Sequence, residues 1–178
     1  KKLRNFLKLR NTSFLGMEKP CLLMRIHLHL LKMLTPSSRL DVDTYFLQMA
    51  KLVARRSTCR RREVGCVLVD SENHVVSTGY NGVPTHFPHC LDTPCEGATA
   101  PSGVSLDKCL AVHAEQNALL QLRSNDILTA YLTVSPCVTC AKMIANSRIR
   151  RIVASYEYAH SFAVDILSQA NIVLEFSP

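Results

Sequence analysis

Two short runs of residues carry the groups that could do chemistry in this chain. His113-Ala114-Glu115 offers an imidazole and a carboxylate, and Pro136-Cys137-Val138-Thr139-Cys140 offers two thiols. Cysteines three residues apart share one face of a helix, so Cys137 and Cys140 can bind the same metal ion. With His113 they supply three ligands, and a tetrahedral zinc ion then keeps its fourth position open for water, as in catalytic sites.

This set of groups favours hydrolytic removal of an amino group from a nucleobase. Zinc lowers the pKa of a bound water from about 15.7 towards 7. Glu115 would take a proton from that water, deliver it to the ring nitrogen N3 and later protonate the departing ammonia. His-x-Glu alone is common by chance, and Cys-x-x-Cys alone could be a redox pair or half of a structural zinc site. Both together in this order are specific.

The elements expected around these runs alternate between strands and helices. Asp41-Val42-Asp43 predicts the start of a helix with apolar positions at helical spacing, namely Tyr45, Phe46, Met49, Leu52 and Val53. Strands are predicted over 64–69, 74–79, 130–134, 150–155 and 171–176, and helices over 112–123, 137–147 and 161–170. The residues between 80 and 108 have little periodicity and predict a long loop. This order favours an α/β sheet covered by helices on both faces.

The positive charge of the chain is confined to its first 40 residues. The formal net charge is +7, but residues 1–40 hold nine Lys or Arg against one acid, and 41–178 hold 12 basic and 13 acidic residues. A near-neutral catalytic region argues against nucleic acid as a partner. No apolar run reaches the roughly 18 residues that a membrane span needs, so a membrane is not expected either.

The domain organisation that follows is a basic N-terminal extension, residues 1–40, before a zinc-dependent deaminase domain, residues 41–178. The extension is either an organellar transit peptide or a segment that is not native to the protein. The eight cysteines, without a secretory signal, indicate reduced thiols and metal binding. We therefore expect a cytoplasmic protein, or an organellar one if residues 1–40 are a transit peptide.

Several further runs sharpen the family. They occur in the order Ser57-Thr58-Cys59-Arg60-Arg61, Val64-Gly65-Cys66, Gly79-Tyr80-Asn81-Gly82-Val83-Pro84, His89-Cys90, the His113 run continued to Ala118, and Ser135 before the two zinc cysteines. Over residues 41–178 these motifs resemble the deoxycytidylate (dCMP) deaminases of bacteria and phages, in the cytidine deaminase superfamily. The resemblance implies a three-layer α/β/α sandwich around a mixed five-stranded sheet. It also implies hydrolysis of dCMP to dUMP and ammonia, which feeds dTMP synthesis.

The resemblance assigns expected roles to five further residues. Asn81 would contact the deoxyribose, and the Ala114 backbone and Ser135 would contact the pyrimidine. Tyr158 would lie near the 5′-phosphate. Arg61 is a plausible phosphate partner because a guanidinium can bind phosphate through two donors. The alternative for Arg61 is a solvated basic turn formed by Arg60–Arg62.

Four cysteines remain for a second, structural zinc. The resemblance implies ligands at Cys59 and Cys90, and Cys95 and Cys109 could complete a closed site that orders the long loop. His89 is the alternative ligand, and free thiols or a redox-sensitive pair are the alternative to a metal. Cys66 and Cys21 are not expected to be ligands.

One departure from the family pattern affects regulation. Where relatives usually carry a glycine, this chain has Thr85-His86-Phe87-Pro88. This neighbourhood helps relatives bind the regulators dCTP and dTTP, and a side chain there could block the approach of phosphate to the backbone. Homo-oligomerisation, as a hexamer, and regulation by these nucleotides are expectations from the resemblance alone.

Two other functions remain open from the sequence. One is a tRNA adenosine deaminase, or another deaminase of nucleic acids or nucleosides in the same superfamily, although the near-neutral domain and the absence of Trp disfavour polynucleotide binding. The other is a non-catalytic module that zinc stabilises. A purely structural site would have no use for the Glu115 carboxylate.

Overall fold

The computed structural model describes residues 39–177, except 102–103, 124–125 and 159–160. Residues from Leu40 onward form one compact unit. Nearly all of the basic extension predicted over residues 1–40, together with Cys21, lies outside the described residues. Within them, no helix is both long enough and apolar enough to cross a membrane.

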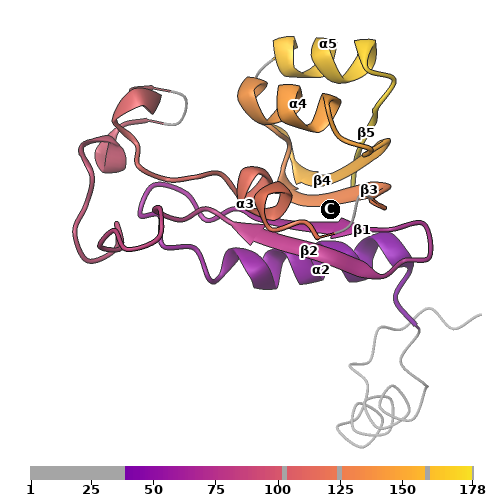
Figure 1. Cartoon of the computed structure of the whole chain (residues 1–178), viewed down its shortest axis with the longest axis horizontal. Helices are drawn as coiled ribbons and strands as arrows, with labels where there is room; N and C mark the ends of the chain where they lie inside the picture. Colours follow the sequence, from indigo (N-terminus) through magenta and orange to yellow (C-terminus); the bar gives the residue numbers. More distant parts are fainter. Residues whose placement is uncertain (1–38, 102–103, 124–125, 159–160, 178) are drawn as a thin grey trace, which may run out of the picture. The chain divides into compact units, whose positions relative to one another are not determined.

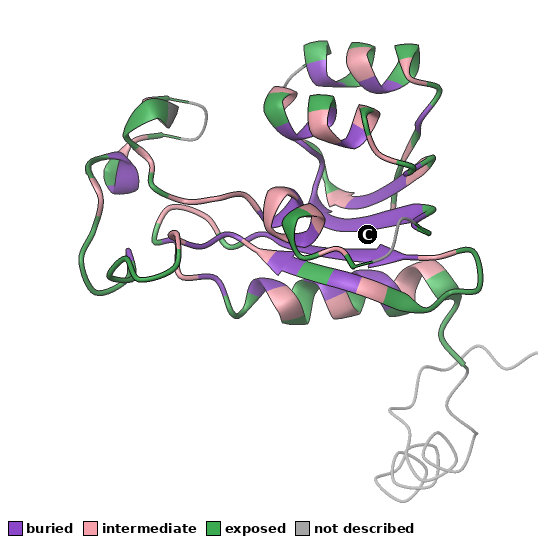
Figure 2. Ribbon diagram, viewed as in Figure 1, coloured by how far each residue is buried: buried purple, intermediate pink, exposed green. Residues whose placement is uncertain are grey.

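The unit is built on a mixed five-stranded sheet, as predicted (Figure 1). The strands are β1 Gly65–Val69, β2 Val75–Tyr80, β3 Thr129–Val134, β4 Arg151–Tyr156 and β5 Val173–Phe176, and their spatial order is β2-β1-β3-β4-β5. β1 is antiparallel to β2 and β3, whereas β3, β4 and β5 run parallel. The central strands β1 and β3 are buried along their whole length, and the edge strand β5 is mostly exposed (Figure 2).

Helices cover both faces of this sheet, which confirms the three-layer prediction. They are α2 Val42–Ala54, α3 Ala114–Leu120, α4 Val138–Ala145 and α5 Ser161–Gln169. Successive residues of a strand point to opposite faces. Val67 of β1 therefore packs towards Leu47 of α2, whereas Cys66 faces the cluster that holds Ala118 of α3 and Ile144 of α4.

The buried stripe of α2 differs from the predicted one. Phe46, Leu47, Ala50 and Ala54 are buried, whereas Tyr45 and Leu52 of the predicted apolar set are exposed. The observed stripe follows the i, i+3/i+4 spacing more closely, because it uses small alanines where the helix approaches the sheet. Gly65 of β1 lies under this helix, at a place where a Cβ atom would collide with the Ala50 carbonyl.

The helix predicted over 112–123 is shorter than expected, and it begins two residues late. Val112 forms a β-bridge with Gly82, through hydrogen bonds of 3.1 and 2.8 Å. His113 then takes an extended backbone as the N-cap of α3. The long loop predicted over 80–108 also holds two short 3₁₀ turns, η1 Glu96–Thr99 and η2 Leu106–Lys108. The bounds of the other elements fall within about two residues of the predicted ones.

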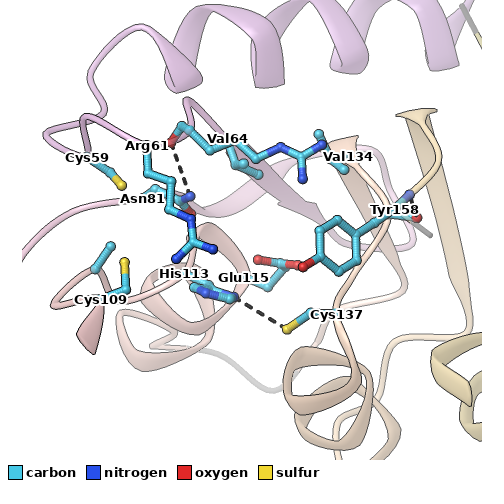
Figure 3. Close-up of a pocket in the computed structure, with 13 residues that line it drawn as sticks. Cys59, Arg61, Val64, Asn81, Cys109, His113, Glu115, Val134, Cys137 and Tyr158 are labelled. Carbon is cyan, nitrogen blue, oxygen red and sulfur yellow. Dashed lines mark hydrogen bonds between the residues drawn. The ribbon is translucent and has the colours of Figure 1, made fainter. Parts of the chain in front are cut away.

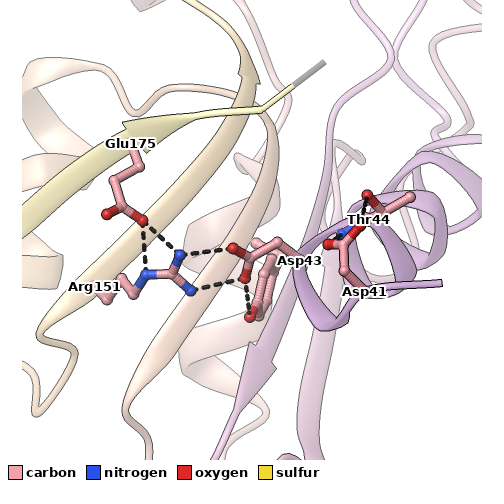
Figure 4. A network of polar contacts seen from close by, with 6 residues as sticks. Asp41, Asp43, Thr44, Arg151 and Glu175 are labelled. Atoms are coloured by element: carbon pink, nitrogen blue, oxygen red, sulfur yellow. Dashed lines mark hydrogen bonds and ion pairs between the residues drawn. The ribbon is translucent and has the colours of Figure 1, made fainter.

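A polar network fastens the start of α2 to the sheet (Figure 4). Arg151 of β4 donates two hydrogen bonds to Asp43, at 2.8 and 2.7 Å, and a third to Glu175 of β5, at 2.8 Å. The Tyr131 hydroxyl donates to Asp43 at 2.9 Å. These hydrogen bonds, above all those from Arg151, hold the pKa of Asp43 below its usual range.

We expect Asp43→Asn to destabilise the fold by about 1–2 kcal/mol at neutral pH, because it removes the charge from a half-buried, doubly bonded pair. Because the pKa of Asp43 is lower in the folded state than in the unfolded state, its charge stabilises the fold fully above the unfolded-state pKa of about 4. This stabilisation is lost as the pH falls through the folded-state pKa. The difference from wild type in urea unfolding should therefore shrink below about pH 4. Asp165→Asn, on the exposed face of α5, is the matched control. Equal midpoints for the two variants at neutral pH would contradict this role.

Candidate active site

The two runs singled out in the sequence meet at the starts of two helices. His113 is the N-cap of α3, Cys137 is the N-cap of α4, and Cys140 lies in the first turn of α4. The His113 Nδ1 atom lies 3.4 Å from the Sγ atom of Cys137 and 3.4 Å from that of Cys140. All three ligand atoms lie within 4.8 Å of one another. The structure thus brings the three predicted ligands together.

This arrangement fits zinc. Bonds of about 2.3 Å to sulfur and 2.1 Å to nitrogen, at a tetrahedral angle, would separate the nitrogen from each sulfur by roughly 3.5 Å. The observed separations are 3.4 Å. Hydrogen bonding with Cys140 and with His113 lowers the pKa of Cys137 to about 4. Both bonds favour the thiolate form of Cys137, which is the form that binds metal.

Glu115 lies beside these ligands in the first turn of α3, and only 5% of its surface is exposed. Its side chain points into the pocket, on the side that faces Tyr158 (Figure 3). Burial raises the pKa of Glu115 to about 6. A carboxyl group with a pKa near the working pH can both accept and release a proton, as general acid–base catalysis requires.

One pocket collects most of the predicted site residues. It forms where the start of β1 and the ends of β2, β3 and β4 meet. Its lining includes nine of them: Cys59, Arg61, Asn81, Cys109, His113, Glu115, Ser135, Cys137 and Tyr158. Cys140 and Ala114 are fully buried behind this surface.

Two residues predicted to touch substrate are bonded to each other. The Asn81 Oδ1 atom accepts a hydrogen bond of 2.9 Å from the Ala114 N–H, and the Asn81 amide nitrogen donates to the Arg62 carbonyl at 3.2 Å. These partners fix which way the amide points. One N–H of Asn81 and the second lone pair of its Oδ1 atom are left over, so Asn81 can meet a ligand as a donor or as an acceptor. The Ala114 N–H is already engaged.

On the opposite wall, Ser135 holds Tyr158 in place. The Ser135 Oγ atom accepts a hydrogen bond of 2.7 Å from the Tyr158 N–H. The Arg62 guanidinium lies over the Tyr158 ring, 5.2 Å from its centroid. Arg62 lines the pocket and was missed by the sequence interpretation, which singled out its neighbour Arg61. The run of three arginines was the available signal, but it did not say which of them face inward.

Arg61 also faces the pocket, and one of its nitrogens is left without a partner. Its Nη2 atom donates to the carbonyls of Pro101 and, at 2.7 Å, of Val104. Its Nη1 atom is buried and, among the described residues, has no hydrogen-bond partner. A buried donor that nothing in the protein satisfies is costly unless a ligand or water meets it.

The four cysteines of the predicted second zinc site are only partly gathered. The sulfur atoms of Cys90 and Cys95 lie 3.7 Å apart, close to the roughly 3.8 Å edge expected of a tetrahedral zinc–sulfur site. Cys59 and Cys109 point towards one another in the pocket wall (Figure 3). Within the described part of the chain, no three of these four sulfur atoms all lie within 4.8 Å of one another.

The segment that departs from the family pattern keeps a glycine-like backbone. His86 has φ of 71°, in the left-handed region that favours glycine. It lines a second pocket together with Thr58, Tyr80, Val83, Phe87 and His89. Asn117 and Gln121 of the α3 region complete the other wall of this pocket.

Comparison with known proteins agrees with this geometry. The family described as cytidine and deoxycytidylate deaminase zinc-binding region matches residues 40–156. The deoxycytidylate deaminase of Mycobacterium phage D29 is 43% identical over 123 residues, which cover 65% of this chain and 95% of the phage protein. The Saccharomyces cerevisiae deoxycytidylate deaminase is 39% identical over 130 residues, which cover 71% of this chain. The match spans only 41% of that yeast protein's length.

Solved structures show the same fold. The dCMP deaminase of cyanophage S-TIM5, in complex with dCMP and dUMP, superposes with a TM-score of 0.65 at 26% identity. The superposition covers 78% of this chain and 98% of the phage chain. The matched family region contains the His113, Glu115, Cys137 and Cys140 motifs. This chain belongs to the cytidine and deoxycytidylate deaminase family, whose defining region binds zinc.

Proposed function

We propose that this protein hydrolyses dCMP to dUMP and ammonia. The observation that carries the choice of a nucleotide concerns Arg61, which lines the same pocket as the metal ligands and Glu115. Its buried Nη1 atom has no hydrogen-bond partner among the residues that the structure describes. A phosphate group would satisfy that donor. The phage relatives support the choice, since one is a deoxycytidylate deaminase and the other is a dCMP deaminase solved with dCMP and dUMP.

The reaction then follows from the residues around the ring. His113, Cys137 and Cys140 would hold the catalytic zinc, which when bound supplies the Lewis acidity that makes water a nucleophile at neutral pH. Glu115 accepts a proton from the water that attacks C4 of cytosine and delivers it to N3. It then takes the second proton, from the hydroxyl group that the water has left on C4, and gives it to the amino group, which leaves as ammonia when the C4–N4 bond breaks and the C4 carbonyl forms. Water and dCMP are thereby converted into dUMP and ammonia.

The other pocket residues orient the nucleotide. Asn81 contributes one N–H as a donor, which suits a hydroxyl or ring oxygen of the deoxyribose. Ser135 lines the base pocket and at the same time fixes Tyr158. The Ala114 N–H is bonded to Asn81, so Ala114 supports the pyrimidine site by holding the Asn81 side chain in place. Burial of these groups keeps the substrate contacts rigid.

Arg61→Gln should weaken the recognition of phosphate. We expect KM for dCMP to rise by roughly 10- to 100-fold, the range of a lost charge-assisted hydrogen bond, with little change for deoxycytidine, which lacks phosphate. Steady-state kinetics on both substrates measure this ratio. Arg60→Gln, which alters an exposed arginine of the same run, is the control. An equal loss on both substrates would show that Arg61 acts only by holding the Pro101 and Val104 carbonyls.

A substrate panel tests the proposed reaction. The protein would be incubated with dCMP, CMP, deoxycytidine, dCTP and a tRNA anticodon stem-loop, and the ammonia released from each would be measured. We expect the highest kcat/KM for dCMP. Release of ammonia from the RNA alone would overturn the assignment in favour of a polynucleotide deaminase.

The second zinc remains part of the proposal. A closed four-cysteine site would form once a metal ion draws the Cys90–Cys95 pair and the Cys59–Cys109 pair together. The proposal is supported by the Cys90–Cys95 separation of 3.7 Å and by the burial of Cys59 and Cys90. Such a site would tie the loop after β2 to the segment before α3. Its role would be structural.

Regulation, assembly and location are proposed on the same family grounds. The regulators dCTP and dTTP would bind near His86, whose φ of 71° is one that glycine adopts readily. The protein would act as a homo-oligomer, a hexamer by resemblance. It would work in the cytoplasm, or in an organelle if residues 1–40 direct import.

A further inference from the structure

The helix that carries the catalytic carboxylate is too short to position itself. α3 has only seven residues, Ala114–Leu120. Isolated helices need roughly 12–15 residues even to be marginally stable, so the direction of α3 must be set by contacts with the rest of the fold. Because His113 caps this helix and Glu115 lies in its first turn, those contacts also decide where the metal ligand and the proton carrier point.

Two side-chain hydrogen bonds are among these contacts. Ser77 of β2 donates to the Ala118 carbonyl at 2.7 Å, and Asn81 accepts from the Ala114 N–H at 2.9 Å. Gly79, between them, lets the start of α3 approach β2, since a Cβ atom there would collide with the Ala114 carbonyl. The helix is thus fastened at both ends to the strand that leads into Asn81.

Asn117 occupies a different place in this arrangement. Its Nδ2 atom donates to the Tyr80 carbonyl at 2.8 Å and to the Val112 carbonyl at 3.4 Å. Tyr80 immediately precedes Asn81, and Val112 immediately precedes His113. The Asn117 side-chain amide therefore links the pocket wall that contains Asn81 to the pocket wall that contains His113. This link lies next to the β-bridge between Val112 and Gly82.

We infer that Asn117 is a positioning residue that fixes Asn81 relative to His113 and Glu115. It does not line the catalytic pocket, so it acts through these two walls and not on the substrate. Its side chain is only half-buried, so its replacement should leave the fold intact. A misplacement of about 1 Å between reacting groups can cost about 10²-fold in rate. The inference rests on the proposed function for its kinetic consequence but not for its structural one.

Asn117→Asp tests the inference, because a carboxylate oxygen would face two carbonyl oxygens in place of a donor. Asn117→Ala, which only removes the bonds, is the second variant in case repulsion prevents folding. Asn146→Asp makes the same chemical change at the exposed C-cap of α4 and serves as the control. Each protein would be compared in two ways: amide hydrogen exchange at Ala114, and kcat and KM for dCMP per zinc-loaded chain.

We expect both Asn117 variants to lose protection at the Ala114 N–H by at least about tenfold, while Leu132 in the centre of β3 keeps its protection. Per zinc-loaded chain, kcat/KM for dCMP should fall by roughly 10²-fold, with the KM raised as well as the kcat lowered. Unchanged protection at Ala114, or an equal loss at Leu132 from global destabilisation, would overturn the inference. An inactive wild type with the expected exchange pattern would instead refute the proposed function alone.

Discussion

Replacing Glu115 with glutamine should leave zinc bound and lower kcat on dCMP by roughly 10²–10⁴-fold, the usual contribution of a general acid–base group. Glutamine has nearly the same shape as glutamate but cannot carry a proton from water to the ring. The loss should appear in kcat more than in KM, since the carboxylate acts on the reacting atoms. Steady-state kinetics and zinc analysis on the same samples would measure both effects.

The control for this variant is Glu72→Gln, which changes an exposed carboxylate on the turn between β1 and β2. It should retain wild-type turnover. A Glu115→Gln protein that loses its zinc would point to a structural role for the carboxylate. One that deaminates at the wild-type rate would show that another group moves the proton.

Cys140→Ala should remove the catalytic zinc and abolish turnover. Mutating a residue that only hydrogen-bonds to a zinc ligand already lowers metal affinity by about 10- to 100-fold. Removing the ligand Cys140 itself should therefore lower zinc affinity by at least about 10²-fold. The variant should hold one zinc fewer per chain than the wild type, after equilibration in a zinc buffer and metal analysis. If the second site is formed as proposed, the wild type holds two zinc ions and the variant holds one.

Cys66→Ala is the matched control, because Cys66 is also fully buried but lies outside the metal cluster. It should keep the wild-type zinc content and most of the activity. Equal zinc affinity of the Cys140→Ala and wild-type proteins would show that the three clustered side chains are not the metal site.

The local parts of the site could be predicted from the sequence because their geometry is local. Cys137 and Cys140 are three residues apart at a helix start, and Glu115 follows His113 by two, so spacing alone indicates a shared metal and a free carboxylate. The alternation of strands and helices likewise predicted the layered sheet, because the hydrophobic period reports which residues face a core.

Long-range contacts could not be predicted in this way. The bond between Asn81 and Ala114 joins residues 33 positions apart, and the pair of Asp43 and Arg151 joins residues 108 positions apart. No local pattern reports such neighbours. The same limit applies to the arginines. Arg61 and Arg62 both line the pocket, but Arg62 was missed because the direction of its side chain depends on where the loop before β1 meets Tyr158. The late start of α3 also follows from a distant partner, Gly82.

The most direct test of the central claim is the formation of dUMP from dCMP by the zinc-loaded wild-type protein, with Glu115→Gln at equal zinc content as the baseline. We predict dUMP and ammonia in a one-to-one ratio, with kcat/KM of at least about 10⁴ M⁻¹s⁻¹, the lower end of the range for enzymes acting on their own substrates. Formation of dUMP at no more than the Glu115→Gln rate would contradict the claim that this pocket deaminates dCMP.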